Sequence, residues 1–414
     1  MDLSKTLPTM VPCRICGGTV YECLDFGRQP LSNGFLKPED VPHERYYRLA
    51  VGICTACTMV QQVHEVPRQL MFHDGYVYRA SGSSLMRKHF EHYAEHLLAT
   101  DLNGEDKFLV EIGCNDGVML RAIHEAGVRH LGVDPSGGAA RVAEENGIRV
   151  RIDFFERATA ADVRAKEGPA DVIFSANTIS HIPYLDSVFG GVDALLAPQG
   201  VFIFEDRYLG DIIARTYFDQ IYDEHFYLFS VESVRAAAEQ YGFQLVDAEH
   251  MPVHGGSIRY TVARPGVREP SASLLALLEQ EREMQLGRHE TFAGFAGRIN
   301  GIRDDLVRLL KDLHGDGKRI LGYGATSKSA TVTMFCGIDS GLVPYICDTT
   351  PGKQGRLAPG SHIPVRTPDA FRDPYPDYAL LFAWNHADEI MAKERTFREA
   401  GGRWILYVPD VHVI

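Results

Sequence analysis

The sequence has no apolar run long enough to cross a bilayer. Its longest apolar stretches, such as GVFIF and YALLFAW, fall far short of the roughly 20 residues that a transmembrane helix needs. The N-terminal segment MDLSKTLPTM also lacks the apolar core of a signal peptide. We therefore expect a cytoplasmic protein with no membrane partner.

Basic residues are also in short supply. The chain carries 42 Lys and Arg against 55 Asp and Glu, which gives a formal net charge of -13. This balance argues against a nucleic-acid partner, because contacts to the phosphate backbone depend on a surplus of Lys and Arg. A small anionic ligand needs only a local cluster of donors. We expect a small-molecule substrate and a monomer or small homo-oligomer.

Cysteine is too rare for a disulfide scaffold, with eight in 414 residues. Four of them form two Cys-x-x-Cys turns, CRIC with Cys13 and Cys16, and CTAC with Cys54 and Cys57. Two such turns can direct four thiolates at one tetrahedral centre, which is typical of structural zinc. Buried cysteines without metal, or a redox pair, are the weaker alternatives. The other cysteines are expected to fill apolar space: Cys23, Cys114, Cys336 and Cys347.

Strand-like and helix-like segments alternate between about residues 108 and 206. Apolar segments such as FLVEIGC and ADVIFSA are separated by stretches with helical periodicity, and the same alternation returns after residue 318. Alternation of this kind predicts mainly parallel sheets covered by helices on both faces. A helix is expected over residues 84–99, and one or two long helices over about 270–313. The fold class is therefore α/β, with two nucleotide-binding-type units and two nucleotide-like ligands.

The segment LVEIGCNDGVML, residues 109–120, predicts the first ligand site. Its spacing is E-x-G-x-x-x-G, whereas nicotinamide and flavin cofactors need a G-x-G-x-x-G turn for their pyrophosphate. S-adenosylmethionine has no phosphate, and Asp134 at the next strand end can accept both ribose hydroxyls. A turn without a ligand is the alternative. The predicted donor contacts are Glu111, Gly113, Asn115, Gly117, Asp134, Pro135, Asp153, Phe154 and Asn177.

The segment RILGYGATSKSATVTMF predicts the second site. It has Gly322-x-Gly324 between a strand and a helix, and Ser327 stands where a dinucleotide site has its third glycine. Backbone amides at this helix N-terminus, with nearby basic side chains, fit a nucleotide diphosphate better than a nicotinamide. A unit used only for packing is the alternative. The predicted contacts are Tyr323, Gly324, Ser327, Lys328, Asp348, Lys353, Arg356 and Asn385.

The stretch IYDEHFYLFS, residues 221–230, is too polar for a buried strand and too aromatic for an ordinary surface loop. It contains the YDEH box, residues 222–225. Together with the two cysteine pairs, EIGCNDG and GYGA, this box resembles the sugar C-methyltransferases. Those enzymes use S-adenosylmethionine to methylate thymidine-diphosphate (dTDP)-linked 4-keto-6-deoxy sugars. The chain is most similar to the C-3-methyltransferase subgroup of antibiotic deoxysugar biosynthesis, including that of the tetronitrose pathway, whose acceptor carries a 3-amino group.

The resemblance implies three domains: a zinc-binding domain over 1–75, a Rossmann-like S-adenosylmethionine domain over 76–268, and a helical connector with a second Rossmann-like domain over 269–414. One departure is Ser329, where many relatives have glycine, and it puts the phosphate contacts of that helix in doubt. The family's catalytic residues correspond to Tyr76, His181, Tyr222, Glu224 and His225.

Methylation at carbon defines what the box must supply. A ketone at C-4 makes the C-3 hydrogen removable as a proton, so the site needs a base near C-3 and donors near the C-4 oxygen. An imidazole suits the base, and a phenol or protonated imidazole suits the oxyanion. We expect His225 to be the base, with His181 as the alternative, Glu224 to orient it, and Tyr222 to donate. A purely structural cluster, a nicotinamide-dependent oxidoreductase and a non-catalytic assembly module are the competing hypotheses.

Overall fold

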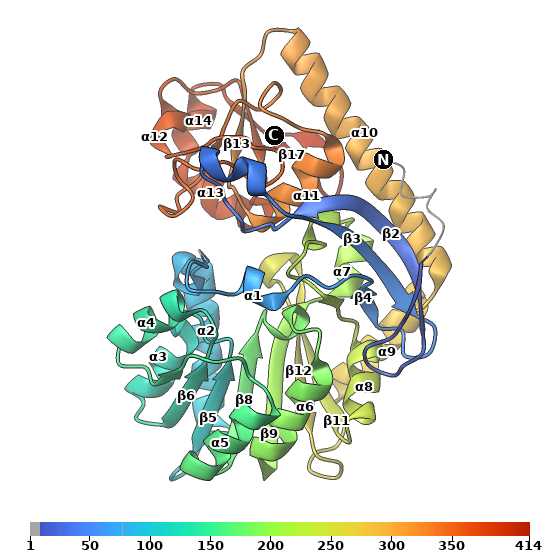
Figure 1. Cartoon of the computed structure of the whole chain (residues 1–414), viewed down its shortest axis with the longest axis vertical. Coiled ribbons are helices and arrows are strands. Elements are labelled where there is room, and N and C mark those ends of the chain that lie inside the picture. The colour runs from blue at the N-terminus through green and yellow to red at the C-terminus, as the bar shows by residue number, and fades with distance from the viewer. Residues whose placement is uncertain (1–8, 77) are drawn as a thin grey trace.

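The computed structural model describes residues 9–76 and 78–414 of the chain. Most of the segment MDLSKTLPTM therefore lies outside the described residues. The described residues form three sheets with helices packed around them, and the N-terminal sheet and helix α10 run alongside both of the larger units (Figure 1). Within this part of the chain, no helix combines the length and the apolar character that a bilayer crossing requires.

The N-terminal sheet is antiparallel and has the order β1-β2-β3-β4-β10. Its last strand does not come from the N-terminal region. It is part of the IYDEHFYLFS stretch, so a segment more than 150 residues downstream completes this sheet. The strands are β1 (Met10–Pro12), β2 (Thr19–Pro30), β3 (Tyr46–Cys54), β4 (Val60–Gln62) and β10 (Tyr227–Leu228), and helix α1 (Arg68–Met71) follows β4.

The central sheet has the order β11-β12-β9-β8-β5-β6-β7, parallel from β9 to β7, with β12 antiparallel to both of its neighbours. The chain runs from β5 to β6 on one side and returns to β8 on the other. This reversal places a ligand crevice at the carboxyl ends of these strands. The strands are β5 (Phe108–Ile112), β6 (Arg129–Val133), β7 (Val150–Arg151), β8 (Ala170–Ala176), β9 (Leu196–Arg207), β11 (Gln244–Met251) and β12 (Ser257–Ala263).

Helices cover both faces of this sheet, as the alternation predicted (Figure 1). Helix α2 coincides with the segment expected at residues 84–99, and its apolar side packs on the sheet. The helices are α2 (Ser84–Ala99), α3 (Val118–Glu125), α4 (Gly137–Glu145), α5 (Arg157–Glu167), α6 (Leu185–Leu195), α7 (Leu209–Ala214) and α8 (Val231–Gln240). Short 3-10 turns η3 (Ile179–His181), η4 (Phe218–Gln220) and η5 (Val253–Gly255) lie at the loop ends.

Two helices, α9 (Ala272–Met284) and α10 (His289–Gly315), lead to the C-terminal sheet, as expected for residues 270–313. That sheet has the order β15-β14-β13-β16-β17-β18 and is parallel except for β18. Its strands are β13 (Ile320–Tyr323), β14 (Ile346–Cys347), β15 (Val365–Arg366), β16 (Tyr378–Leu381), β17 (Arg403–Leu406) and β18 (His412–Val413). Its helices are α11 (Ser327–Cys336), α12 (Asp369–Arg372), α13 (Ala387–Lys393) and α14 (Arg395–Glu399), with the turn η6 (Trp384–His386).

The IYDEHFYLFS stretch is buried along its whole length. Its polar side chains Asp223, Glu224 and His225 form hydrogen bonds with other parts of the chain. Only Tyr227 and Leu228 form a strand. Tyr227 packs in the core and its hydroxyl donates to the carbonyl of Pro183 at 2.9 Å. The four cysteines outside the Cys-x-x-Cys turns are buried or half-buried, as expected of small apolar fillers.

Candidate active site

The four cysteines of the two Cys-x-x-Cys turns come together in the N-terminal sheet. Their sulfur atoms all lie within 4.8 Å of one another. Cys13 and Cys57 are 3.6 Å apart, and Cys16 and Cys54 are 3.5 Å apart. Zinc–sulfur bonds of about 2.3 Å in a tetrahedron would separate the sulfurs by roughly 3.8 Å, so the set fits zinc. Backbone N–H groups donate to three of these sulfurs, from Ile15, Gly18 and Ala56.

The turn after β5 lies at the crevice of the central sheet. Gly113 has a φ of 74°, and a Cβ there would collide with the side chain of Thr178 in the loop after β8. Gly117 has a φ of 76° at the start of α3, and its Cβ would lie 2.9 Å from that of Ala143. Only glycine allows both the left-handed backbone and these close approaches. The turn is therefore held directly against the loop that carries Asn177 and His181.

Two carboxyl groups flank this turn. Asp134 follows β6 and accepts from the backbone N–H of Asn115 at 2.8 Å and of Ser136 at 2.7 Å. Glu111 is buried on β5, and its Oε2 has no hydrogen-bond partner among the described residues. Burial raises the pKa of both groups, and for Glu111 the nearby Asp134 adds to this effect. Such carboxyl groups are ready to accept hydroxyl or ammonium donors.

The remaining predicted donor contacts lie around the same sheet edge. Phe154 follows β7 and lies under the guanidinium of Arg68, 4.0 Å from its ring centroid. Asp153 is paired with Arg151 at 3.1 Å. Asn177 has a φ of 52° after β8, and its Oδ1 is buried without a partner among residues 9–76 and 78–414. Pro135, next to Asp134, is half-buried.

The YDEH box places its imidazole in a stack of rings. The ring of His225 lies 3.9 Å from that of Tyr222 and 5.2 Å from that of His181, and Phe72 stacks on the other side of His181 at 5.6 Å. His225 Nδ1 donates to the carbonyl of Gln220 at 2.5 Å, because a carbonyl can only accept. This leaves His225 Nε2 as an unprotonated nitrogen, buried and without a partner among the described residues.

Glu224 does not contact His225, contrary to the expectation that it orients the base. Its Oε1 accepts from Asn33 Nδ2 at 2.6 Å, and its Oε2 accepts from the hydroxyl of Tyr76 at 3.1 Å. Burial, with the neighbouring Asp223, raises the pKa of Glu224 to about 7. The carbonyl of Gln220 accepts from His225 instead and fixes its ring.

The N-terminal sheet holds the box from behind. Strand β10 pairs with β4, and the side chain of Gln62 donates to three box carbonyls, those of Tyr222 at 2.8 Å, Asp223 at 3.1 Å and His225 at 2.9 Å. The carboxylate of Asp223 in turn accepts from the backbone of Ser32 at 3.1 Å. The backbone of the box is therefore fixed by residues of the four-cysteine region.

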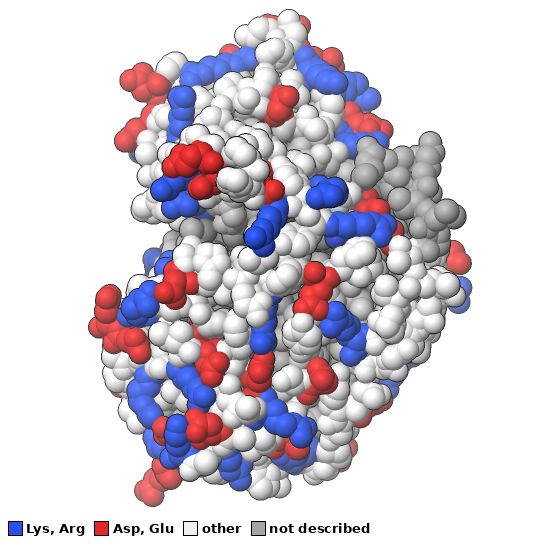
Figure 2. All heavy atoms as spheres, viewed as in Figure 1, with Lys and Arg blue, Asp and Glu red and all other residues white. Residues whose placement is uncertain are grey.

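The segment after β4 joins the box to the donor turn. Tyr76 reaches Glu224, and four residues later the backbone of Ala80 donates to Asn115 Oδ1 at 3.0 Å. The hydroxyl of Ser81 donates to Asp116 at 2.6 Å. The predicted donor site and the predicted catalytic residues thus share one region of the molecule. The space-filling view shows an indentation between the central and C-terminal units on this side (Figure 2).

The C-terminal unit contributes two buried lysines. Lys328, in the first turn of α11, donates to Asn385 Oδ1 and lies 4.7 Å from the ring centroid of Trp384. Lys353 donates to the carbonyl of Ala325 at 2.8 Å. Burial lowers the pKa of Lys328 to about 8 and also lowers that of Lys353. Lys328 therefore lies in the helix that follows the turn after β13, and the amine of Lys353 lies against the carbonyl of that turn.

Other predicted contacts of this unit lie further away or face other groups. Tyr323 points into the core, and its hydroxyl donates to Glu394 at 2.9 Å. Arg356 donates to the carbonyl of Phe35 at 3.1 Å, and Asp348 accepts from the backbone of Thr350 at 2.7 Å. Gly324 has a φ of 83° and Ser327 opens α11. The turn itself is thus present, while the Tyr323 side chain is directed away from it.

Three further polar residues lie in this region, the buried Asp219 and the half-buried Arg207 and His254, and none of them was predicted from the sequence. Arg207 ends β9, the strand whose segment GVFIFED was predicted, so its place at a strand end was the available signal. His254 has a φ of 57°, and its Nε2 lies 3.4 Å from Asn177 Nδ2. Asp219 accepts from Trp384 at 2.6 Å and from Tyr407 at 2.5 Å. No motif marks the last two.

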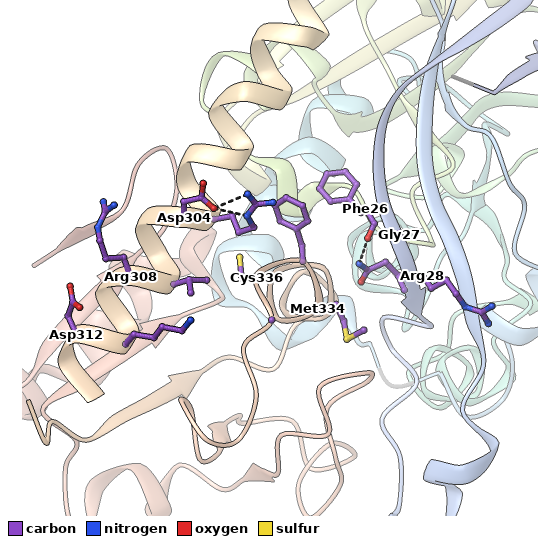
Figure 3. Close-up of a pocket in the computed structure, with 14 residues that line it drawn as sticks. Phe26, Gly27, Arg28, Asp304, Arg308, Asp312, Met334 and Cys336 are labelled. Atoms are coloured by element: carbon purple, nitrogen blue, oxygen red, sulfur yellow. Dashed lines mark hydrogen bonds and ion pairs between the residues drawn. The ribbon is translucent and has the colours of Figure 1, made fainter. Parts of the chain in front are cut away.

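A separate cavity of about 750 Å³ lies between β2, α10 and the C-terminal end of α11 (Figure 3). Arg28, Arg308 and Lys311 contribute basic groups to its walls, and Asp304 and Asp312 contribute acidic ones. None of the predicted site residues lines it. It lies at the opposite end of α11 from Lys328.

Family models match most of the chain. A zinc binding domain matches residues 13–72, a methyltransferase domain matches 86–248, and a C-methyltransferase C-terminal domain matches 252–409. C-methyltransferase NovU of Streptomyces niveus is 34% identical over 408 residues, which cover 97% of this chain and 96% of that protein. The ubiquinone biosynthesis O-methyltransferase of Ralstonia nicotianae is 30% identical over 96 residues, covering 23% of this chain and 40% of that protein.

Among solved structures, an S-adenosylmethionine-dependent methyltransferase from Archaeoglobus fulgidus covers 42% of this chain and 75% of its own, with 16% identity and a TM-score of 0.35. The match to NovU extends over all three sheets. The chain therefore belongs to the sugar C-methyltransferase family that its motifs resemble, and it is an S-adenosylmethionine-dependent C-methyltransferase.

Proposed function

We propose that the protein methylates C-3 of a dTDP-linked 4-keto-6-deoxy sugar, with a 3-amino-2,3,6-trideoxy sugar as the preferred acceptor, in antibiotic deoxysugar biosynthesis. The observation that supports this most is the state of His225. Its Nε2 carries no proton in the neutral tautomer and has no partner among the described residues, and its ring stacks on His181, in the loop that contacts the donor turn. A buried neutral imidazole beside the donor turn is the group that removal of a carbon-bound proton requires.

We assign the base to His225 rather than His181. Within the part of the chain that the structure describes, the Nε2 atoms of both imidazoles have no hydrogen-bond partner, but His225 has its other nitrogen fixed by Gln220, which sets its tautomer and ring plane. His181 is stacked between Phe72 and His225, and it shapes the wall of the cleft next to the base. A base must keep its lone pair aimed at one atom, and the fixed tautomer of His225 does this.

Tyr222 and Tyr76 supply neutral donors. Burial raises the pKa of both phenols well above neutral pH, so each keeps its proton and can donate to a substrate oxygen. Tyr76 is also held by Glu224, whose carboxyl group is itself held by Asn33. Glu224 therefore positions Tyr76 over the cleft, and its role toward the base is indirect.

The C-terminal unit is proposed to bind the dTDP moiety. The N–H groups at the start of α11 and the buried amines of Lys328 and Lys353 can neutralise a diphosphate. Gly324 brings the backbone of this turn close to Ala383: a Cβ added at Gly324 would lie 2.7 Å from the Cβ of Ala383, so a side chain has no room there. Ser327, which opens α11, and Asn385, which accepts from Lys328, add polar groups beside this turn. S-adenosylmethionine, held at Glu111, Gly113 and Asp134, supplies an electrophilic methyl group.

Zinc is proposed as a structural ion bound by Cys13, Cys16, Cys54 and Cys57. With four protein ligands it has no open position, so it would take no part in methyl transfer. The proposed domain limits are 1–75, 76–268 and 269–414. The pairing of β10 with β4 makes the first of these domains a support for the box in the second.

Mass spectrometry of a panel of dTDP-4-keto sugars incubated with S-adenosylmethionine tests the proposal. We expect a mass increase of one methyl group on a sugar with hydrogen at C-3, and loss of a deuterium label from that carbon. Replacing His225 with Asn should slow turnover by about 10²–10⁴-fold. A label that survives into the product would instead indicate O- or N-methylation, and near-normal turnover of His225→Asn would move the role of base to His181.

A further inference from the structure

Arg207 occupies an unusual position for an arginine. It ends β9, where it pairs with Ser257 of β12, and its side chain is only 13% exposed. Its Nε and Nη1 are buried and have no hydrogen-bond partner among the described residues. The nearest carboxylate oxygen, Asp206 Oδ1, is 3.8 Å away and already accepts from Ser180 at 2.6 Å. Buried arginines are normally paired, so this one needs an explanation.

The guanidinium belongs to the last residue of β9, at the carboxyl edge of the central sheet. Its charge acts on groups from several elements: His181 in η3, and Tyr222, Glu224 and His225 in the box. It also acts on Tyr78, Asp206, His254 and Lys328, which surround it from the linker, β9, η5 and α11. Arg207 is therefore a fixed cation near the centre of the group of side chains that the proposed reaction uses.

We propose that Arg207 donates from Nε and Nη1 to the C-4 ketone oxygen of the sugar and stabilises the enolate. This inference depends on the proposed function and adds a residue to it. A guanidinium presents its N–H groups as a rigid fork, which can place two donors on one oxygen or on adjacent oxygens. Because its donors are already desolvated and fixed, they need not reorganise when charge develops on that oxygen.

Arg207 assists the removal of the C-3 proton and the methyl transfer that follows it. The C-3–H bond breaks, its proton passes to His225 Nε2, and its electron pair moves onto the C-4 oxygen as the enolate. C-3 then forms a bond to the sulfonium methyl group while the S–CH₃ bond breaks, and its electrons remain on sulfur in S-adenosylhomocysteine. The imidazolium afterwards returns its proton to solvent. The negative oxygen lies next to Arg207 throughout the life of the enolate.

The same charge links proton transfer to enolate formation. In the free enzyme, burial and the neighbouring guanidinium lower the pKa of His225 well below its usual value. An imidazolium beside an uncompensated Arg207 is therefore unfavourable. Once the ketone oxygen becomes negative, it neutralises the guanidinium and removes that repulsion. The base is thus free of a proton before the reaction and accepts one only as the enolate forms.

The test measures exchange of the C-3 proton with D₂O in the presence of S-adenosylhomocysteine, which isolates the deprotonation step from methyl transfer. We expect Arg207→Gln to lower exchange and methyl transfer by about 10²–10³-fold, the usual loss for one oxyanion donor. Arg207→Lys keeps the positive charge but not the planar fork of donors, so its two rates should lie between those of the wild type and of Arg207→Gln. Arg215→Gln, which removes an exposed arginine eight residues on, should leave both rates unchanged.

Two further measurements separate this role from a structural one. Removing a buried, unpaired charge should leave the melting temperature of Arg207→Gln equal to or above that of the wild type, whereas a structural role predicts a lower one. The acid limb of kcat/KM should move to higher pH in Arg207→Gln, because the pKa of the imidazoles rises once the cation is gone. Isothermal titration with S-adenosylhomocysteine should give an unchanged Kd.

The outcomes distinguish this inference from the proposed function. If the wild type methylates none of the dTDP-4-keto sugars, the proposed function fails. If the wild type methylates one of them and Arg207→Gln exchanges the C-3 proton within about threefold of the wild-type rate, only the role of Arg207 fails. If Arg207→Gln and the apolar Arg207→Met both fail to fold, the residue is structural and the inference is equally overturned.

Discussion

The imidazoles and phenols around the box are neutral at neutral pH, and the guanidinium of Arg207 lies near them as a fixed cation. Burial lowers the pKa of His181 to about 3 and keeps Tyr222 protonated. Burial also brings the pKa of Glu224 to about 7. A neutral base, neutral phenols and a desolvated guanidinium together suit a reaction that begins with a neutral ketone and creates charge inside the site.

The buried imidazole of His181 should make the protein less stable as the pH falls. Folded His181 stays neutral down to about pH 3, whereas the unfolded chain takes up a proton below about pH 6.5. The unfolded state then binds more protons, so the free energy of unfolding decreases on acidification. Between pH 8 and pH 5.5, His181 alone should cost about 1.4 kcal/mol.

Urea unfolding of the wild type and of His181→Asn at these two pH values measures this cost. The absolute stabilities of the two proteins will differ, so the comparison is between their changes with pH. The variant should lose about 1.4 kcal/mol less than the wild type on acidification. His92→Asn, which removes an imidazole whose side chain is 89% exposed, should keep the wild-type change. An equal change in the wild type and His181→Asn would show that His181 takes up a proton in the folded protein.

Some site residues could be predicted from their spacing and others could not. The Cys-x-x-Cys pairs have a recognisable spacing, and the YDEH box holds its polar residues side by side, so the sequence alone indicates both. Arg207 was missed because arginine is usually exposed, and nothing in GVFIFEDR shows that this one is buried. Tyr323 was included because it borders the GYGA turn. In a strand buried on both faces, however, no hydrophobic alternation shows which way a side chain points.

Secondary structure with strong periodicity was predictable at the scale of the element. Helix α2 has amphipathic spacing over four turns, and β8 has an apolar centre, residues 172–174, between Asp171 and Ser175. Strand β10 could not be predicted, because it has only two residues and its partner β4 lies about 160 positions earlier. Such a pairing depends on the tertiary fold and leaves no local pattern.

The contact between β4 and the box predicts an effect of Gln62. Its buried amide donates to three carbonyls at 2.8, 3.1 and 2.9 Å. Replacing Gln62 with Ala leaves these carbonyls without that donor, which should cost about 1–3 kcal/mol of stability. It should also slow methyl transfer by roughly 10²-fold, since a displacement of about 1 Å near the chemistry has an effect of this size.

Thermal unfolding and steady-state kinetics of Gln62→Ala provide the measurement. Gln240→Ala, which changes an exposed glutamine at the end of α8, is the matched control and should behave like the wild type in both assays. If Gln62→Ala is destabilised but retains full kcat, then the N-terminal sheet supports the fold without positioning the base.

The short turn η4 contacts both the N-terminal sheet and the C-terminal unit. Phe218 of η4 stacks with Phe26 of β2 at 6.3 Å, and Asp219 accepts from Trp384 and Tyr407 of the C-terminal unit. The carbonyl of Gln220 fixes the tautomer of His225. Three consecutive residues therefore connect the four-cysteine sheet, the proposed nucleotide unit and the proposed base. A displacement of the four-cysteine sheet or of the C-terminal unit would therefore change the position of the His225 imidazole.

Removal of the metal should therefore reduce catalysis without affecting the donor site. The cysteines fix the ends of β3 and β4, and these strands carry Gln62 and border the loop with Asn33. Without a metal the four thiolates would repel one another and the sheet would loosen. We expect a loss of at least about 2 kcal/mol, or roughly 4–8 °C in Tm for units of 150–250 residues.

Zinc release after treatment with a chelator, or in Cys16→Ser, should be accompanied by a loss of methyl transfer of about tenfold or more, because the box loses its support. Isothermal titration should still give the wild-type Kd for S-adenosylhomocysteine, since that site is built by the central sheet. Cys23→Ala, outside the cluster, should release no zinc. A metal-free protein with full activity would separate the four-cysteine sheet from catalysis, whereas a parallel loss of donor binding would show that the metal supports the entire central unit.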